Sequence, residues 1–274
     1  MRGLTRAASA GSRRFAVAAV RRTARLLGFE LTPALQPGEA CMQRLKEIRA
    51  RLGQVDPQSR RFLEFCLENL TLSRSDILQD LFVLFETGTR RAGYFVEFGA
   101  ADGIAGSNTY ALEREFGWTG ILAEPAQCWH DTLARNRRCI VDRRCVTDRT
   151  GDTVLFRECR YPANSTIDSY ADHDRFRGVR RRGFRRYPVP TVSLGDLLRE
   201  HGAPEEFDYL SVDTEGSEAM ILGGLDFGAY RPKVITVEHC HSAARERLFA
   251  LLSAQGYRRK HAELSQIDDW YVRG

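Results

Sequence analysis

Residues 94–103 read Tyr94-Phe95-Val96-Glu97-Phe98-Gly99-Ala100-Ala101-Asp102-Gly103, and Gly106-Ser107-Asn108-Thr109 follow. A short apolar run, a turn of small residues and the start of a helical pattern are typical of the first strand, loop and helix of an open α/β sheet. Gly99 and Gly103 let the backbone amides of such a loop approach a ligand closely. The stretch therefore predicts a nucleotide-like ligand at the carboxyl end of this strand.

The loop lacks the features of two common nucleotide motifs. A dinucleotide fingerprint would need glycine at positions 101 and 104, where this chain has Ala101 and Ile104. A phosphate-binding loop would need a Lys-Ser or Lys-Thr pair, and the sequence contains neither. We therefore expect a ligand that contains an adenosine but no pyrophosphate.

Carboxylates at the strand ends narrow the identity of this ligand. Glu97 ends the first strand, Glu124 ends the second, and Asp148 follows the third. Glu124 is placed to accept hydrogen bonds from a ribose diol, and Asp148 is placed to reach an adenine amine. An acidic cradle without phosphate-binding groups favours S-adenosylmethionine, which carries a sulfonium and an ammonium. The alternative is that these glycines and acids only terminate strands.

The rest of the chain continues the α/β pattern after a helical preface over residues 39–88. The expected strands are Tyr94 to Phe98, Gly120 to Ala123, Cys139 to Val146, Thr153 to Arg157, Tyr209 to Val212, Val234 to Val237, Tyr257 to His261 and Trp270 to Val272. The expected helices are Thr109 to Phe116, Gln127 to Arg135, Leu194 to Glu200, Ser217 to Leu222 and Ala243 to Ala254.

Four blocks of the sequence resemble the FkbM-type S-adenosylmethionine-dependent methyltransferases. Besides the glycine block, they are Gly117-Trp118-Thr119-Gly120 through Glu124-Pro125 to Asn136-Arg137, then Val189-Pro190-Thr191-Val192-Ser193-Leu194, then Asp208 to Glu218 with Val237-Glu238. The resemblance covers about residues 90–273. The chain departs from the family pattern at Ala101, where glycine or asparagine is frequent, and at Thr214, often valine or isoleucine.

The resemblance implies a Rossmann-like class I methyltransferase fold, with a mostly parallel seven-stranded sheet and helices on both faces. We expect a basic arm and helical extension over residues 1–89 and a methyltransferase domain over 90–274, with an Arg-rich insertion at about 160–188. S-adenosylmethionine is the expected cofactor. Its expected binding residues are Glu97, Gly99, Ala101, Asp102, Gly103, Ser107, Asn108, Thr109, Glu124, Pro125, Asp148 and Asp213.

The expected reaction centre lies beyond the carboxyl ends of the central strands. Asp213 is our choice to bind the cofactor ammonium, in line with its place in the family pattern. Methyl transfer to oxygen needs a base for the acceptor proton, and we rank His239 first, because it titrates nearest neutral pH, with Glu238 second and Glu215 as a third candidate. The alternative for His239 is a structural residue that starts a loop. We expect no metal ion, although the acidic cluster has the chemistry to hold a divalent cation.

The positive charge of the chain belongs to two segments. The 274 residues carry a net charge of +5, yet residues 1–29 and 175–186 each hold seven arginines and no acid, and the remainder is net acidic. A net acidic body with few aromatic residues in its Arg run disfavours nucleic acid. The Arg run is either a solvated loop or a grip for phosphate, a sugar nucleotide or a lipid-linked glycan.

The N-terminal arm has three interpretations. An acid-free, Arg-rich start is typical of a mitochondrial presequence, of an amphipathic helix on anionic lipid, or of a solvated arm. On a helical wheel Phe15, Ala19, Leu26 and Leu27 share one side. We keep contact of residues 1–29 with an anionic membrane as one interpretation.

The compartment and the activity follow as expectations. Seven cysteines without a C-x-x-C pair favour reduced thiols in the cytoplasm, with the inner face of the membrane as the alternative location. We expect an O-methyltransferase acting on a hydroxyl of a sugar, surface glycan or secondary metabolite, the partner being a small-molecule or glycan acceptor. The alternatives are transfer to nitrogen or nucleic acid, and a catalytically silent cofactor-binding scaffold. The sequence leaves the oligomeric state open.

Overall fold

The computed structural model describes residues 46, 56–172 and 176–274. By its internal contacts the chain divides into two units, Met1–Arg51 and Leu52–Gly274. In the first unit the described residue is Lys46, which is helical. The expected basic arm, with its membrane contact over residues 1–29, lies outside the described residues.

The second unit is built around a seven-stranded sheet with the strand order β10-β11-β9-β8-β1-β2-β3. Neighbours from β9 to β3 pair in parallel, whereas β11 pairs antiparallel with both β9 and β10. The expected α/β architecture is confirmed, and the sheet is mixed. Its strands are β1 (Tyr94–Phe98), β2 (Thr119–Ala123), β3 (Ile140–Asp142), β8 (Glu206–Val212), β9 (Arg231–Glu238), β10 (Tyr257–Lys260) and β11 (Asp268–Arg273).

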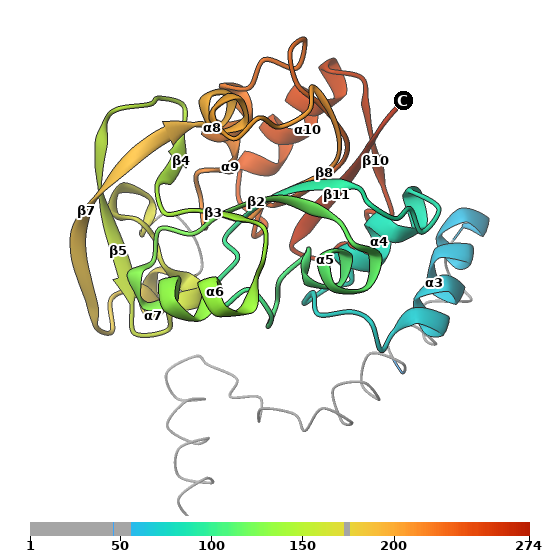
Figure 1. The fold of residues 1–274 in the computed structure, drawn as a ribbon, viewed down its shortest axis with the longest axis horizontal. Coiled ribbons are helices and arrows are strands. Elements are labelled where there is room, and N and C mark those ends of the chain that lie inside the picture. The colour runs from blue at the N-terminus through green and yellow to red at the C-terminus, as the bar shows by residue number, and fades with distance from the viewer. Residues whose placement is uncertain (1–45, 47–55, 173–175) are drawn as a thin grey trace, which may run out of the picture. The chain divides into compact units, whose positions relative to one another are not determined.

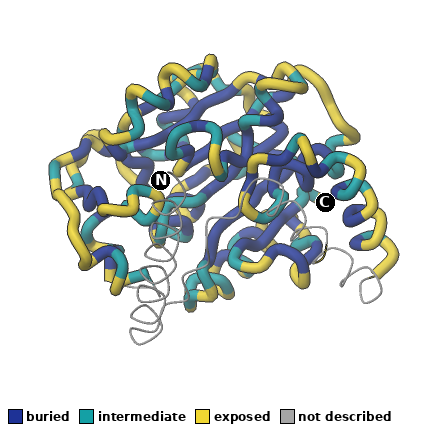
Figure 2. The backbone as a smooth tube through the Cα atoms, turned by 90° about the horizontal axis from the view of Figure 1, so that it is seen from below, coloured by how far each residue is buried: buried dark blue, intermediate teal, exposed yellow. Residues whose placement is uncertain are grey.

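Helices cover both faces of this sheet (Figure 1). One face carries α8 (Leu194–Glu200), α9 (Glu218–Gly223) and α10 (Ala244–Ala254), whose apolar side chains join the strands in one core. The opposite face carries α4 (Gln79–Glu86) and α5 (Tyr110–Phe116), and α6 (His130–Asn136) follows β2. In Figure 2 the strands form the buried centre, and exposed residues concentrate in the outer helices and loops.

The helical preface of the sequence packs onto the same unit. In α3 (Pro57–Asn69), Asp56 caps the helix by accepting hydrogen bonds from the backbone amides of Gln58 and Ser59 at 2.7 and 3.2 Å. Proline at the first helical position suits the turn, because its missing amide hydrogen has no partner there. Phe62 of α3 stacks on His261 with 4.8 Å between ring centroids, which joins the helix to the end of β10.

A second sheet, absent from the sequence-based prediction, has the order β4-β7-β5-β6. The expected strand over 139–146 is two strands, because the charged Asp142-Arg143-Arg144 turn sends the chain from β3 into β4 of the other sheet. The C-terminal end of the expected Arg-rich insertion is also strand, since β7 begins at Phe184 and pairs antiparallel with the whole of β5. These elements are β4 (Cys145–Thr147), β5 (Thr153–Cys159), β6 (Thr166–Ile167), the short helix α7 (Arg177–Arg180) and β7 (Phe184–Ser193).

The strand order reverses between β8 and β1, which are the fourth and fifth strands of the seven-stranded sheet. Loops that leave such neighbours on opposite faces open a crevice at their carboxyl ends, which is where open α/β sheets bind ligands. Within the described residues, no helix combines the length and apolarity needed to cross a membrane.

Candidate active site

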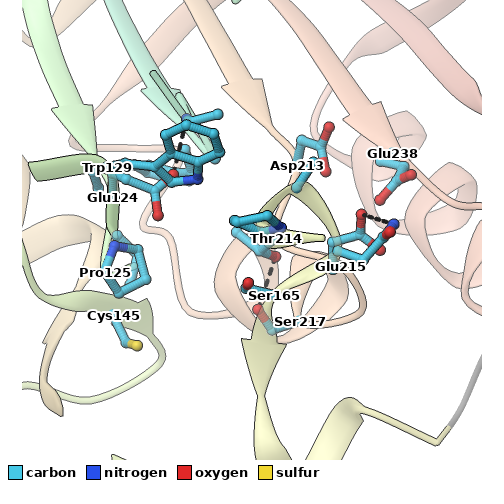
Figure 3. Close-up of a pocket in the computed structure, with 18 of the residues that line it drawn as sticks. Glu124, Pro125, Trp129, Cys145, Ser165, Asp213, Thr214, Glu215, Ser217 and Glu238 are labelled. Carbon is cyan, nitrogen blue, oxygen red and sulfur yellow. Dashed lines mark hydrogen bonds between the residues drawn. The ribbon is translucent and has the colours of Figure 1, made fainter. Parts of the chain in front are cut away.

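A cavity of about 270 Å³ lies at the carboxyl ends of the central strands, near the lower end of the range of roughly 300–1,000 Å³ for small-molecule pockets. The seven-stranded sheet and the second sheet both contribute to its wall (Figure 3). The lining includes Gly99 and Ala101 after β1, Glu124, Pro125 and Trp129 after β2, Asp213 to Glu215 after β8, Glu238 of β9, and Cys145, Phe156, Asn164, Ser165 and Phe176 from the second sheet and its loops.

The turn after β1 requires glycine at its first position. Gly99 has a φ of +79°, and a Cβ atom there would lie 2.1 Å from the carbonyl oxygen of Asp213 at the end of β8. The absence of a side chain therefore lets the two strand ends meet. Ala101 also lies in the left-handed region, at φ +48°, a conformation that disfavours side chains. This explains in physical terms why glycine or asparagine is frequent at the matching position of the family.

Glu124 holds this turn against the end of β2. One of its carboxyl oxygens accepts from the Ala101 amide at 2.9 Å, and the other accepts from the Ala126 amide at 2.8 Å. Burial, partly opposed by these two hydrogen bonds, raises the pKa of Glu124 to about 7. A cationic or hydrogen-bond-donating ligand beside Glu124 would stabilise the ionised form of its carboxyl group.

Three carboxyl groups converge on the other side of the cavity. Oxygen atoms of Asp213, Glu215 and Glu238 lie within 4.8 Å of one another, and Figure 3 shows Asp213 and Glu238 side by side. Burial and the neighbouring Glu238 raise the pKa of Asp213 well above its usual value. Burial and the neighbouring Glu215 raise the pKa of Glu238 to about 8. The cluster favours protons or a bound cation, because like charges at this spacing repel.

Arg180 of α7 supplies a cation to this cluster. Its Nη2 donates to Oε2 of Glu215, and its side chain is fully buried. Nε of Arg180 also donates to the backbone oxygen of Asn164 at 2.9 Å. The pair neutralises one of the three acids and fixes the loops of the second sheet over the cavity.

The structure places several predicted cofactor residues behind the cavity wall. Glu97 is buried and accepts from the Asn108 amide at 2.7 Å and the Ser107 hydroxyl at 3.0 Å, and it also accepts from the Thr109 hydroxyl. The Arg137 guanidinium lies 3.7 Å from the same carboxylate. These residues shape the loop before α5, and none of them is among those that line the cavity.

Three further predicted residues also lie outside the lining. Asp102 accepts from the amides of Ile104 and Ala105 at 2.8 and 2.9 Å, which closes the turn. Gly103, at φ +81°, leaves room for Leu133, whose Cδ1 would lie 2.6 Å from a Cβ atom there. Asp148 packs near Gly224 at the end of α9. Their direct contact with a cofactor therefore remains a prediction.

His239, our first choice as base, is buried outside the cavity lining. Its Nδ1 accepts from the His241 amide at 2.9 Å, and its Nε2 lies 3.7 Å from Asp269. Glu238 ends β9 and lines the cavity, whereas His239 follows the strand and does not. Burial lowers the pKa of His239. The geometry thus favours Glu238 over His239 for the base.

The site residues that the sequence did not single out include Trp129, Cys145, Phe156, Asn164 and Phe176. Trp129 and Cys145 follow the ends of β2 and β3, so their position beside the predicted site was a usable signal. The other three depend on the second sheet and its loops, for which the sequence-based prediction had no strand pairing.

The fold and the site define an α/β enzyme with an acidic, glycine-lined crevice at the switch point of its sheet. Comparison with family models finds the methyltransferase FkbM domain over residues 97–259, more than half of the chain. The protein belongs to the FkbM methyltransferase family. It is a methyltransferase whose cofactor is S-adenosylmethionine.

Solved structures of methyltransferases are similar at low identity. An O-methyltransferase from Bacillus cereus in complex with SAH is 13% identical, with 88% of this chain and 91% of that chain covered and a TM-score of 0.38. Precorrin-6y C5,15-methyltransferase from Geobacter metallireducens is 10% identical, with coverage of 66% and 71% and a TM-score of 0.37. No curated protein sequence matches the chain.

The residues of the cavity fit this cofactor. The side-chain-free turn at Gly99 lies in the cavity wall, and burial raises the pKa values of Glu124 and Asp213, so a positive charge bound beside either carboxyl group would favour its ionised form. A ligand with an ammonium and a sulfonium supplies this charge, and Glu124 has the acceptor oxygens for a ribose diol.

Proposed function

We propose that this methyltransferase acts on oxygen, and that its acceptor is a hydroxyl of a sugar, a surface glycan or a secondary metabolite. The observation that carries the proposal is the convergence of Asp213, Glu215 and Glu238 in the same cavity as the glycine turn. Carboxylates accept hydrogen bonds from hydroxyl groups, so the cluster suits an acceptor that presents several of them.

Glu238 is the proposed proton acceptor. The cofactor supplies a methyl group on a positively charged sulfur, and the acceptor hydroxyl must lose its proton to a nearby base as it reacts. Burial raises the pKa of Glu238 to about 8 in the cofactor-free protein, and a cationic sulfonium bound beside it would favour the ionised form that can accept the proton. Asp213 directly follows β8 and lies beside Glu238 of β9, and it is the proposed partner of the cofactor ammonium.

Arg180 keeps Glu215 charged and fixed, so in our proposal Glu215 orients the acceptor. Asn164 contributes a second polar group, because its Nδ2 lies 3.4 Å from Oε1 of Glu215. Phe156, Phe176 and Ile267 supply an apolar part of the cavity wall.

The proposal is tested by incubating the protein with S-adenosylmethionine carrying a ¹³C-methyl group and a panel of sugars, glycans and hydroxylated metabolites. We expect a labelled methyl ether, identified by the carbon chemical shift of the product. A label on nitrogen, or a label only on nucleic acid, would contradict the proposal and favour the alternative acceptors.

Two variants with the same chemical change separate catalysis from binding. Glu238→Gln removes the base, and we expect turnover to fall by roughly a hundredfold or more while cofactor affinity changes little. Glu205→Gln changes an exposed residue outside the cavity lining and should leave turnover unchanged. Equal activity in the two variants would remove Glu238 from its proposed role.

A further inference from the structure

Positive charge is segregated in the part of the chain that contains the second sheet. Residues 143–193 hold 12 basic and 6 acidic residues, whereas residues 194–274 hold 9 basic and 14 acidic residues. Several arginines of the second sheet and α7 have an acidic partner. These pairs are Arg157 and Arg186 with Asp168, Arg180 with Glu215, Arg181 with Asp172, and Arg185 with Glu158.

In the described part of the chain, Arg143, Arg149, Arg160 and Arg177 have no such pair, and of these four Arg160 and Arg177 lie next to segments that line the cavity. Both are exposed, and among residues 56–172 and 176–274 neither has a carboxylate within ion-pairing distance. Unpaired, exposed guanidinium groups are available to an anion, and their planar fork matches the oxygens of a phosphate. Pairing to an acid in the protein would have cancelled this attraction.

These two arginines flank segments that line the cavity. Arg160 lies two positions before Pro162, and Arg177 directly follows Phe176. The two segments are joined, because Nε of Arg180 in α7 donates to the backbone oxygen of Asn164. Tyr161, between Arg160 and the lining, is 61% exposed and offers an aromatic face. Cations and an aromatic ring therefore stand beside an acidic cavity.

We propose that Arg160 and Arg177 bind a phosphate group of the methyl acceptor at the rim of the cavity. The proposal rests on the proposed O-methyltransferase function and narrows the acceptor to a phosphorylated molecule. The separation of charge supports the proposal, since the acidic cluster repels phosphate and accepts hydrogen bonds from hydroxyl groups, whereas the arginines at the rim attract phosphate. The phosphate stays outside while a hydroxyl reaches Glu238, and Tyr161 packs against the part between them.

Binding of glucose 1-phosphate, with glucose as the neutral analogue, tests the soluble form of such a ligand. The readout is tryptophan fluorescence, because Trp129 lines the cavity whereas Trp118 and Trp270 are buried in the core. We expect the full-length, cofactor-saturated protein to bind glucose 1-phosphate roughly tenfold more tightly than glucose at low salt. Added salt should reduce this preference.

Arg160→Ala with Arg177→Ala should abolish the preference for phosphate. The matched control is Arg60→Ala with Arg114→Ala, which removes the same charge from exposed positions of α3 and α5 and should retain the preference. A phosphate carried by a lipid is tested with the same variants by comparing their cosedimentation with phosphatidylglycerol vesicles and with phosphatidylcholine vesicles. Loss of binding only in the vesicle assay assigns a lipid-linked phosphate, and loss in the fluorescence assay assigns a soluble one.

The proposal is overturned if the rim variant and the control variant behave alike in both assays. Calorimetric titration with S-adenosylmethionine separates this outcome from a failure of the proposed function. The rim variant should bind the cofactor as the unmodified protein does, because neither arginine lines the cavity. Selective phosphate binding without methyl transfer to any hydroxyl would instead refute the O-methyltransferase assignment.

Discussion

The buried guanidinium of Arg180 pairs with the carboxylate of Glu215, although the two residues are 35 positions apart in the sequence. Glu215 lies in the left-handed region at φ +59°, in the loop that follows β8. The ion pair therefore connects α7 to the loop after β8, beside the cavity to which both parts of the structure contribute lining residues. A buried charge that loses its partner is costly, so the pair should matter for stability as well as for the site.

A double-mutant cycle on Arg180→Gln and Glu215→Gln measures this contact. We expect each single change to lower the free energy of unfolding by about 3 kcal/mol, and a coupling energy of about 2 kcal/mol between them. Urea denaturation of the four proteins supplies the values. Arg181 and Asp172, 64% and 48% exposed, provide the surface control, for which we expect a coupling below about 1 kcal/mol. Equal coupling in both cycles would contradict the buried-pair argument.

The sequence predicted the positions of the main strands well. The carboxyl ends of β1, β2 and β8 fall at Phe98, Ala123 and Val212, where the apolar runs end. The same pattern placed Gly99, Glu124 and Asp213 beside one another, since parallel strands bring their carboxyl ends to one edge. A local signal was sufficient there.

The second sheet and Arg180 could not be predicted in the same way. Pairing of β5 with β7 joins Cys159 to Phe184 across the intervening loops, and no local period encodes such a register. The arginines of residues 175–186 have similar neighbours in the sequence, so nothing local marks Arg180 as the one that pairs with Glu215 and is buried. His239 follows the end of β9, so its burial beside Asp269 could not be predicted from a strand pattern.

Asp213→Ala and His239→Ala should affect different properties. Asp213 lines the cavity, so its loss should abolish detectable cofactor binding in calorimetric titration. His239 is buried beside Asp269 and outside the lining, so His239→Ala should leave cofactor affinity near normal and cost roughly 1–3 kcal/mol of stability. Loss of cofactor binding in the histidine variant, with the fold intact by circular dichroism, would refute this assignment.

Gly99→Ala should disrupt the site far more than a matched change elsewhere. The new methyl group would meet the Asp213 carbonyl oxygen at 2.1 Å and force β1 and β8 apart. Gly256 has a similar φ of +83°, and nothing lies within 4 Å of a Cβ atom there. Gly256→Ala should therefore cost only about 1 kcal/mol, from the left-handed conformation alone. Thermal denaturation and cofactor titration of both variants measure this difference in stability and cofactor affinity. The two variants would behave alike if glycine were needed at position 99 only for its positive φ.

Chelation should leave methyl transfer unchanged. Asp213, Glu215 and Glu238 bring their oxygens within 4.8 Å of one another, a spacing that could hold a metal ion. Arg180 already supplies positive charge to Glu215, which lowers the demand for a divalent cation. Turnover measured before and after treatment with EDTA tests this prediction. A loss that magnesium or manganese restores would show that the cluster is a metal site.

The stability of the cofactor-free protein should fall as the pH rises from about 5 to 8. Burial raises the pKa of Glu124 and Asp268 to about 7 and that of Glu238 to about 8, whereas the unfolded chain ionises carboxyl groups near pH 4. Each of these carboxyl groups therefore contributes most to the free energy of unfolding below the pKa that it has in the unfolded chain. This contribution is lost as the pH rises through the pKa of the group in the folded protein.

The measurement is urea denaturation across this range, with and without S-adenosylmethionine. Each unit of pKa difference corresponds to about 1.4 kcal/mol, so Glu238→Gln should flatten the curve visibly, whereas Glu205→Gln, at an exposed position, should not. A cationic ligand stabilises ionised carboxylates, so stabilisation by the cofactor should be greater at pH 8 than at pH 5. A curve that keeps its slope in Glu238→Gln would show that this carboxyl group is already ionised in the cofactor-free protein.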